Sequence, residues 1–141
     1  MNVLIDLNVL LDVFQKREPY YRSSALTRSK SLEGFCVAVI PAHALTTLHY
    51  LISKNSGVDK ANDVIDIMLL SFTVAPISQK TFQRARELNA IDFEDSVVMA
   101  VAEEMNCHYI VTRNSRDFLK STIRALSPSE FLLQLALSER S

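Results

Sequence analysis

Three aspartates stand where acidic side chains interrupt apolar strands or open a helix. Asp6 follows "NVLI", Asp95 lies in "DFED", and Asp117 lies in "TRNSRDF". If these loops meet at one sheet edge, the three carboxylates repel one another and their pKa values rise, unless a cation lies between them. Mg²⁺ or Mn²⁺ prefers oxygen ligands, activates water and stabilises charge on a phosphate. We therefore expect Asp6, Asp95 and Asp117 to form a catalytic metal site.

Each of these aspartates also has a purely structural explanation. Asp6 and Asp95 could cap the helices they open or match the charge of the helix dipole, and Asp117 could pair with Arg113 or Arg116. Taken singly, each position favours this interpretation, because capping is the commonest use of Asp before a helix. Taken together, at equivalent ends of different strands, the three acids favour the metal site.

Neutral and basic side chains flank the acids. Asn8 and Asn114 carry amide oxygens that can bind a metal or orient water, while Arg113, Arg116 and Lys120 make the segment around Asp117 net positive. Such a segment can hold phosphates with an affinity that depends on salt. We expect Asn114 to join the metal ligands, and Asn8, Arg113 and Arg116 to bind substrate.

The elements that must position these residues follow from the hydrophobic pattern. Short apolar stretches predict strands over 2–5, 35–40, 72–77, 108–112 and 123–126. Helical periodicity predicts helices over 8–17, up to Gly34, and over 42–54, 58–71, 79–89, 92–105 and from Ser127 onward. This alternation predicts an α/β fold: a three-layer α/β/α sandwich with a central, mostly parallel sheet of four to five strands. In such a fold the site lies beyond the carboxyl ends of the strands.

Other titratable residues lack this placement. Glu94 and Glu103 fit solvated helix faces, and His43 has no metal-binding spacing to another histidine. Cys36 and Cys107 lie far apart in apolar surroundings, which predicts two buried, reduced thiols.

Composition limits the class of protein. The chain has 141 residues, of which 48% are hydrophobic and 22% charged, and this predicts a single domain over 1–141. A net charge of −1 gives no general attraction to nucleic acid, so any such binding must rest on a local patch. The N-terminal apolar run is too short to span a bilayer and contains Asp6 and Asp12. We expect a cytoplasmic protein without a membrane anchor.

Three stretches carry a family resemblance: "VLIDLNVLLDVFQKREPYY", "DFEDSVVMAVAEEMNCHYIVTRNSRDF" and "ALSPSEFL". Together they resemble the PIN-domain ribonucleases, particularly the bacterial branch of VapC-like toxins, and the second stretch is the most specific. The resemblance implies an α/β/α sandwich, acids that bind Mg²⁺ or Mn²⁺, and cleavage of single-stranded RNA, often within a toxin–antitoxin pair. By position, Asp6 corresponds to the first family acid, Asp95 to the third, and Asp117 or Asn114 to the fourth.

The chain departs from the family pattern at two positions. Leu7 stands where Thr or Ser usually follows the first acid, and Thr47 stands where the helix after the second strand normally carries an acid. A hydroxyl is a weaker, neutral ligand, so Thr47 removes one negative charge from the site and lowers its expected metal affinity. His43 lies one turn before Thr47 and shares its helix face, so its imidazole is a candidate to compensate for the missing acid.

Three functions remain open at this point. The leading hypothesis is a metal-dependent endoribonuclease acting as the toxin of an antitoxin pair, and the alternative is a PIN-like RNA- or protein-binding module whose cleavage is weakened by Thr47. A phosphatase of the haloacid-dehalogenase type also uses an Asp at the end of a first strand, but it needs an acid two residues later, where Asn8 stands. The long apolar helices over 41–54 and 58–71 further predict a homodimer.

Overall fold

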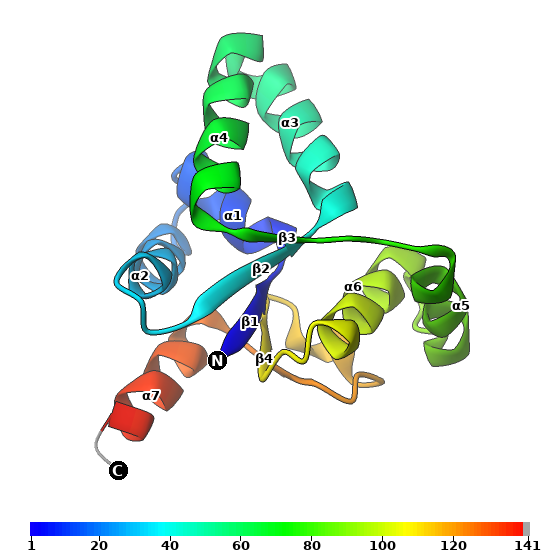
Figure 1. The fold of residues 1–141 in the computed structure, drawn as a ribbon. Coiled ribbons are helices and arrows are strands. Elements are labelled where there is room, and N and C mark those ends of the chain that lie inside the picture. The colour runs from blue at the N-terminus through cyan, green and yellow to red at the C-terminus, as the bar shows by residue number, and fades with distance from the viewer. Residues whose placement is uncertain (140–141) are drawn as a thin grey trace.

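The computed structural model describes residues 1–139, which contain five β-strands, seven α-helices and one 3₁₀ helix (Figure 1). In chain order the elements are β1 (Asn2–Ile5), α1 (Leu7–Phe14), α2 (Tyr21–Leu32), β2 (Val37–Pro41), α3 (Ala42–Ser56), α4 (Val58–Ser71), β3 (Thr73–Ala75), α5 (Gln79–Leu88), α6 (Phe93–Glu104), β4 (Tyr109–Val111), η1 (Ser115–Phe118), β5 (Arg124–Leu126) and α7 (Pro128–Glu139).

One sheet forms the middle of the molecule, and all of its strand pairs are parallel. The strand order is β3-β2-β1-β4-β5, so β1 lies at the centre. In register, Val3 lies opposite Ala38 of β2 on one side and Tyr109 of β4 on the other. This five-stranded parallel sheet, with helices on both faces, confirms the predicted α/β sandwich.

Side chains that alternate along the strands build two separate cores. Val3, Ile5 and Ile40 belong to the core that includes side chains of α1, α3, α4 and α7. Leu4 and Val39 point to the opposite face and pack with α5 and α6. Successive strand residues face opposite sides, so strands buried on both sides must be apolar throughout. Figure 1 shows α5 and α6 together on one side of the sheet, with α1, α2 and α7 on the other.

The helices α3 and α4 form a hairpin that extends away from the sheet (Figure 1). Gly57 joins them with a φ of 92°, a backbone conformation that favours glycine. The hairpin exposes large apolar side chains, because Tyr50, Leu69 and Leu70 are 62%, 58% and 89% exposed. This part of the molecule therefore offers apolar surface outside both cores.

Side chains and one glycine cap the ends of several helices. Gly34 has a φ of 88° just beyond α2, a left-handed conformation that suits glycine and that lies where the sequence predicts this helix to end. Ser78 and Thr81 form a capping box at the start of α5. At α7, the backbone N–H of Glu130 donates to the Ser127 hydroxyl, while the Ser127 N–H donates to the Glu130 carboxylate. These local signals fix where the helices begin and end.

The second strand differs from the prediction at both ends. It begins at Val37, because the Phe35 N–H still donates to Lys30 O and closes the end of α2. It also includes Pro41, which is both its last residue and the N-cap of α3. Phe35 and Val37 are 41% and 45% exposed, so the start of this apolar stretch is not buried on both faces.

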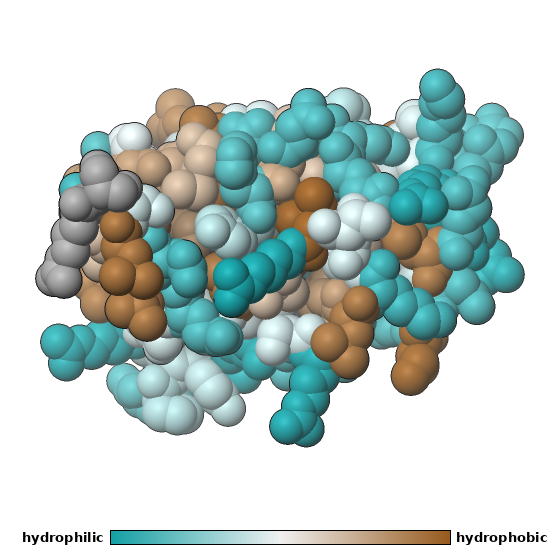
Figure 2. Space-filling view, turned by 90° about the horizontal axis from the view of Figure 1, so that it is seen from below, coloured by the Kyte–Doolittle hydropathy of each residue, from teal (hydrophilic) through white to brown (hydrophobic). Residues whose placement is uncertain are grey.

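The two cysteines are free and buried, as predicted. Burial raises the pKa of both thiols, that of Cys107 to about 11. Within residues 1–139, no helix is both long enough and apolar enough to span a bilayer. Figure 2 shows one face of the molecule, on which hydrophilic side chains are interspersed with separate hydrophobic groups.

Candidate active site

The carboxyl ends of β1 and β4 meet at the sheet edge where the predicted acids lie. The backbone N–H of Asp6 donates to Val111 O at 2.9 Å, which holds the end of β1 against the end of β4. A hollow of about 260 Å³ opens there. It is lined by five predicted site residues, namely Asp6, Asn8, Asp95, Asn114 and Asp117. The structure therefore brings together residues from three distant segments.

Asp6 is held by two hydrogen bonds. Its Oδ1 accepts from the backbone N–H of Leu7 at 2.9 Å, and its Oδ2 accepts from the Thr112 hydroxyl at 2.8 Å. Asp6 is therefore the N-cap of α1, as its structural explanation required, and it lines the hollow as well. Burial raises the pKa of Asp6, although the two hydrogen bonds oppose that rise.

Thr112 is a site residue that sequence reasoning missed. It is fully buried just past β4, where its backbone N–H donates to Leu126 O of β5. Its hydroxyl donates to Asp6 and accepts from the backbone N–H of Asn114 at 3.1 Å. One side chain thus fixes both the first acid and the loop that carries Asn114. The available signal was a hydroxyl residue directly after an apolar strand.

Asp95 lies in the first turn of α6, which Asp92 caps by accepting the Glu94 N–H at 2.8 Å. Burial is the main reason why the pKa of Asp95 rises to about 7. Coulombic repulsion from Asp92, Asp6, Asp117 and Glu94 adds to the rise, in that order. The charges of the other carboxylates at this site therefore make the Asp95 carboxyl harder to ionise.

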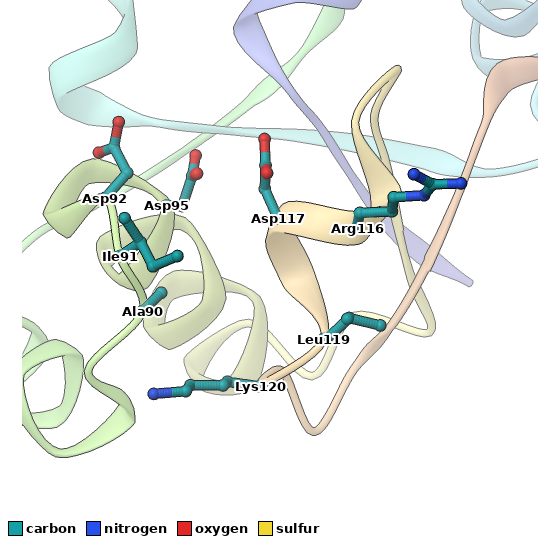
Figure 3. Close-up of a pocket in the computed structure, with 8 residues that line it drawn as sticks. All are labelled: Ala90, Ile91, Asp92, Asp95, Arg116, Asp117, Leu119 and Lys120. Carbon is teal, nitrogen blue, oxygen red and sulfur yellow. The ribbon is translucent and has the colours of Figure 1, made fainter.

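Asp117 enters the site from η1. Its backbone N–H donates to Asn114 O at 2.9 Å, and the neighbouring Phe118 is only 3% exposed. The buried ring therefore anchors the turn that presents the exposed carboxylate. In Figure 3, the carboxylates of Asp92, Asp95 and Asp117 all point toward the same side.

Glu94 is a second residue that the sequence did not reveal. Predicted to be a solvated face, it lines the hollow with the other acids, and its charge raises the pKa values of Asp6 and Asp95. Its Oε1 lies 3.5 Å from Nε2 of His43 on α3. Thr47, one turn beyond His43, instead directs its hydroxyl to its own helix, where it donates to His43 O at 3.5 Å.

Arg113 has partners that the sequence did not suggest. Its Nε lies 2.9 Å from Oδ2 of Asp12, which is 0% exposed, and its guanidinium stacks 4.1 Å from the centre of the Tyr20 ring. Asp12 also accepts from the Ser24 hydroxyl at 3.2 Å. Its burial raises the pKa of Asp12, and the Arg113 charge opposes this. Substrate binding by Arg113 stays a prediction, and its visible contacts are with α1 and Tyr20.

Arg116 lies beside the acids. It is exposed and, with Asp95 and Asp117, lines a second hollow of about 430 Å³. Figure 3 shows its guanidinium pointing away from the three carboxylates. Arg116 is therefore available at the rim of the site, while Arg113 is engaged elsewhere.

The donor set suits a hard divalent cation. Carboxylates and amide oxygens are its preferred ligands, and a cation would relieve the repulsion that raises the pKa of Asp95. Within residues 1–139, no three His, Cys, Asp or Glu side chains are arranged to hold a metal ion as they stand.

Known proteins resemble this chain over most of its length. Ribonuclease VapC1 of Aquifex aeolicus is 24% identical over 134 residues, which are 92% of each chain. Among solved structures, VapBC2 from Rickettsia felis, bound to a DNA fragment from its promoter, has a chain that matches with a TM-score of 0.67 and 19% identity, over 90% of this chain and 98% of that one.

A third relative is VapC20 of Mycobacterium tuberculosis, a toxin that cleaves the sarcin-ricin loop. It matches with a TM-score of 0.63 and 14% identity, over 77% of this chain and 86% of its own. At such identities the solved structures establish the likeness of fold. The family model of the PIN domain matches residues 2–116, which include β1, β4 and every acid that lines the hollow except Asp117. The chain belongs to the PIN domain family.

Proposed function

We propose that this chain is an endoribonuclease that cleaves single-stranded RNA with Mg²⁺ or Mn²⁺. The observation that carries the proposal is that Asp6, Asp95 and Asp117 line one hollow at the carboxyl ends of the strands, where burial and four neighbouring carboxylates raise the pKa of Asp95 to about 7. Repulsion of this kind, at the carboxyl ends of parallel strands, is typical of a site built for a cation. The relative named as a ribonuclease supports the same reaction class.

Each side chain has a distinct role in this proposal. Asp6, Asp95 and Asp117 hold the ion, with Asn114 as a neutral ligand. Asn8 orients water or substrate, and Arg116 contacts a phosphate from the rim. When bound, the cation would activate water and stabilise the charge that develops on the phosphate. Thr112 keeps the Asp6 carboxylate in place.

A binding module without cleavage is the alternative, and its basis is Thr47. The contacts of Glu94 argue against it, because this side chain adds a carboxylate to the hollow that holds Asp6, Asp95 and Asp117. The charge that is absent at position 47 is therefore supplied from α6. The comparisons also favour a nuclease.

Incubation of the purified chain with a fluorescent single-stranded RNA and Mn²⁺ tests the proposal. Cleavage by the wild type that Asp6→Asn abolishes is the expected result. Absence of cleavage by the wild type, together with cleavage by Thr47→Glu, would establish the binding module instead. Asp66→Asn on the exposed face of α4 is the control for a general change of charge.

We further propose that this nuclease is a cytoplasmic toxin neutralised by a small protein antitoxin. Several structural relatives are toxin–antitoxin complexes, which supports such a partner. Co-expression with the neighbouring reading frame should yield a stable complex in which RNA cleavage is inhibited. A homodimer is a separate proposal, supported by the exposed Tyr50, Leu69 and Leu70, and light scattering of the purified chain measures it.

A further inference from the structure

A second hollow adjoins Asp95 and Asp117, and Asp6 does not line it. Its volume is about 430 Å³, and it shares Asp92, Asp95 and Asp117 with the smaller hollow. One wall is the loop between α5 and α6, and the other runs from η1 to Lys120. An RNA strand that places one phosphate at the acids must continue past them, and this is the larger space they border.

The walls of this second hollow carry exposed aliphatic side chains. Ile91 is 108% exposed relative to its reference and Leu119 is 82% exposed, and they come from opposite walls. Figure 3 shows them on either side of the space, below the carboxylates. Large apolar side chains so fully in water, paired across a hollow beside a reaction site, indicate a ligand with apolar faces.

Charge differs between the two ends of the hollow. The three carboxylates lie at one end and Lys120 at the other (Figure 3). The Lys120 ammonium donates to Asn89 O at 2.7 Å, which ties the η1 wall to the end of α5 and uses one of its three donors. The remaining donors suit a phosphate. Apolar faces with a phosphate at one end are the features of a nucleotide in a single strand.

We propose that the second hollow holds the nucleotide next to the cleaved phosphodiester, with Ile91 and Leu119 against its base and Lys120 against its outer phosphate. This inference rests on the proposed ribonuclease function. Aliphatic side chains have no hydrogen-bonding groups, so they accept any base. The position is therefore expected to tolerate all four bases.

RNA binding tests the inference in a chain carrying Asp6→Asn, which blocks cleavage. Fluorescence anisotropy with a labelled single-stranded RNA should show Kd rising roughly 3- to 10-fold for Ile91→Ser and for Leu119→Ser. Leu32→Ser is the matched control, because Leu32 is 55% exposed on α2 outside this hollow. Lys120→Ala should weaken RNA binding. It should also reduce the slope of log Kd against log salt concentration by about one, because one fewer counterion is released.

An RNA without a base at the nucleotide beside the mapped cleavage position gives a second, independent readout. It should bind the parent chain more weakly, and Ile91→Ser should then add no further loss, because the contact is already missing. A full additional loss with this RNA would overturn the assignment. Unchanged Kd values for Ile91→Ser and Leu119→Ser would also overturn it.

Two further outcomes separate this inference from the function on which it rests. If the wild type neither binds nor cuts RNA, the ribonuclease proposal itself fails. If the wild type does both while Ile91→Ser and Leu119→Ser bind normally, only the nucleotide position is wrong. A labelled hexa-arginine peptide that loses affinity through these two variants, with RNA affinity unchanged, would assign the hollow to a basic polypeptide instead.

Discussion

The hydroxyl of Thr112 donates to Oδ2 of Asp6 across 106 residues of sequence, at 2.8 Å. The same hydroxyl accepts from the Asn114 N–H, so it links the end of the central strand β1 to the loop that leads to Asp117. It also lowers the pKa of Asp6 against the effect of burial. The geometry of the site therefore depends on one neutral side chain.

Thr112→Val tests this dependence, since valine keeps the shape and removes the hydroxyl. The free energy of unfolding should fall by about 1–3 kcal/mol, because Asp6 and the Asn114 N–H both lose a partner. Urea denaturation measures the change. Thr112→Ser retains the hydroxyl and should keep most of the wild-type free energy of unfolding. Equal losses of stability in the two variants would mean that Thr112 stabilises the fold by packing and not by its hydrogen bonds.

Asp95 makes the metal-free protein less stable as pH rises. Its pKa is about 7 in the folded state and 3.8 ordinarily, so below pH 4 it is protonated in both states. Between pH 4 and 7 only the unfolded chain releases this proton, which favours unfolding. With EDTA present, Asp95→Asn should match the wild-type Tm near pH 4 and exceed it at pH 8. The same difference at both pH values would contradict the assignment, and Asp66→Asn serves as the control.

Glu94 should contribute to metal affinity in place of an acid at position 47. Removal of one carboxylate from the hollow weakens the attraction for a divalent cation, so Glu94→Gln should raise the Kd for Mn²⁺ about tenfold, or about 1.4 kcal/mol. Isothermal titration calorimetry at pH 8 measures it. Asp63→Asn, on the exposed side of α4, should leave the Kd unchanged.

Thr47→Glu provides the reciprocal experiment. Thr47 follows His43 by one turn, and His43 contacts Glu94, so an acid at position 47 would approach the same hollow. In the Glu94→Gln background it should restore most of the lost Mn²⁺ affinity. If Thr47→Glu raises the Mn²⁺ affinity of the wild type but Glu94→Gln alone changes nothing, Glu94 lies outside the metal site.

The two arginines beside the site should behave differently on substitution. Arg113→Met leaves the fully buried Asp12 carboxylate without its cation, and it should cost about 3–5 kcal/mol of unfolding free energy. Arg116→Met, at an exposed position, should cost less than about 0.5 kcal/mol. Urea denaturation compares them. Asp12→Asn together with Arg113→Met should recover part of the loss, and similar costs for both arginine variants would refute a special role for the Asp12 pair.

Two of the three acids could be predicted because their positions follow from strand ends, whereas Asp95 was predicted from the helix it opens. Asp6 and Asp117 lie just past strands, and parallel strands place such residues at one sheet edge whatever the details of packing. The same reasoning gave the layers and the order of helices and strands. It could not give the boundaries of β2, because these depend on how the end of α2 hydrogen-bonds to Phe35.

Contacts between distant segments could not be predicted from the sequence. Nothing local marks Thr112 as the partner of Asp6, and Asp12 looks like a solvent-facing helix acid until α2 covers it. Glu94 is also exposed, as its pattern predicted, yet the capped first turn of α6 brings it to the hollow. Thr112 and Glu94 were therefore missed because only the folded chain brings them to the site.

The central strand β1 is synthesised before the strands on either side of it, and this orders the assembly of the site. Its edge toward β2 can pair early, but its other edge stays open until residues 109–111 exist. An unpaired strand edge of this kind invites association with other chains. A nascent or truncated chain that stops before β4 lacks Thr112, Asn114 and Asp117 as well. Any chemistry at the hollow is thus withheld until translation has passed these residues.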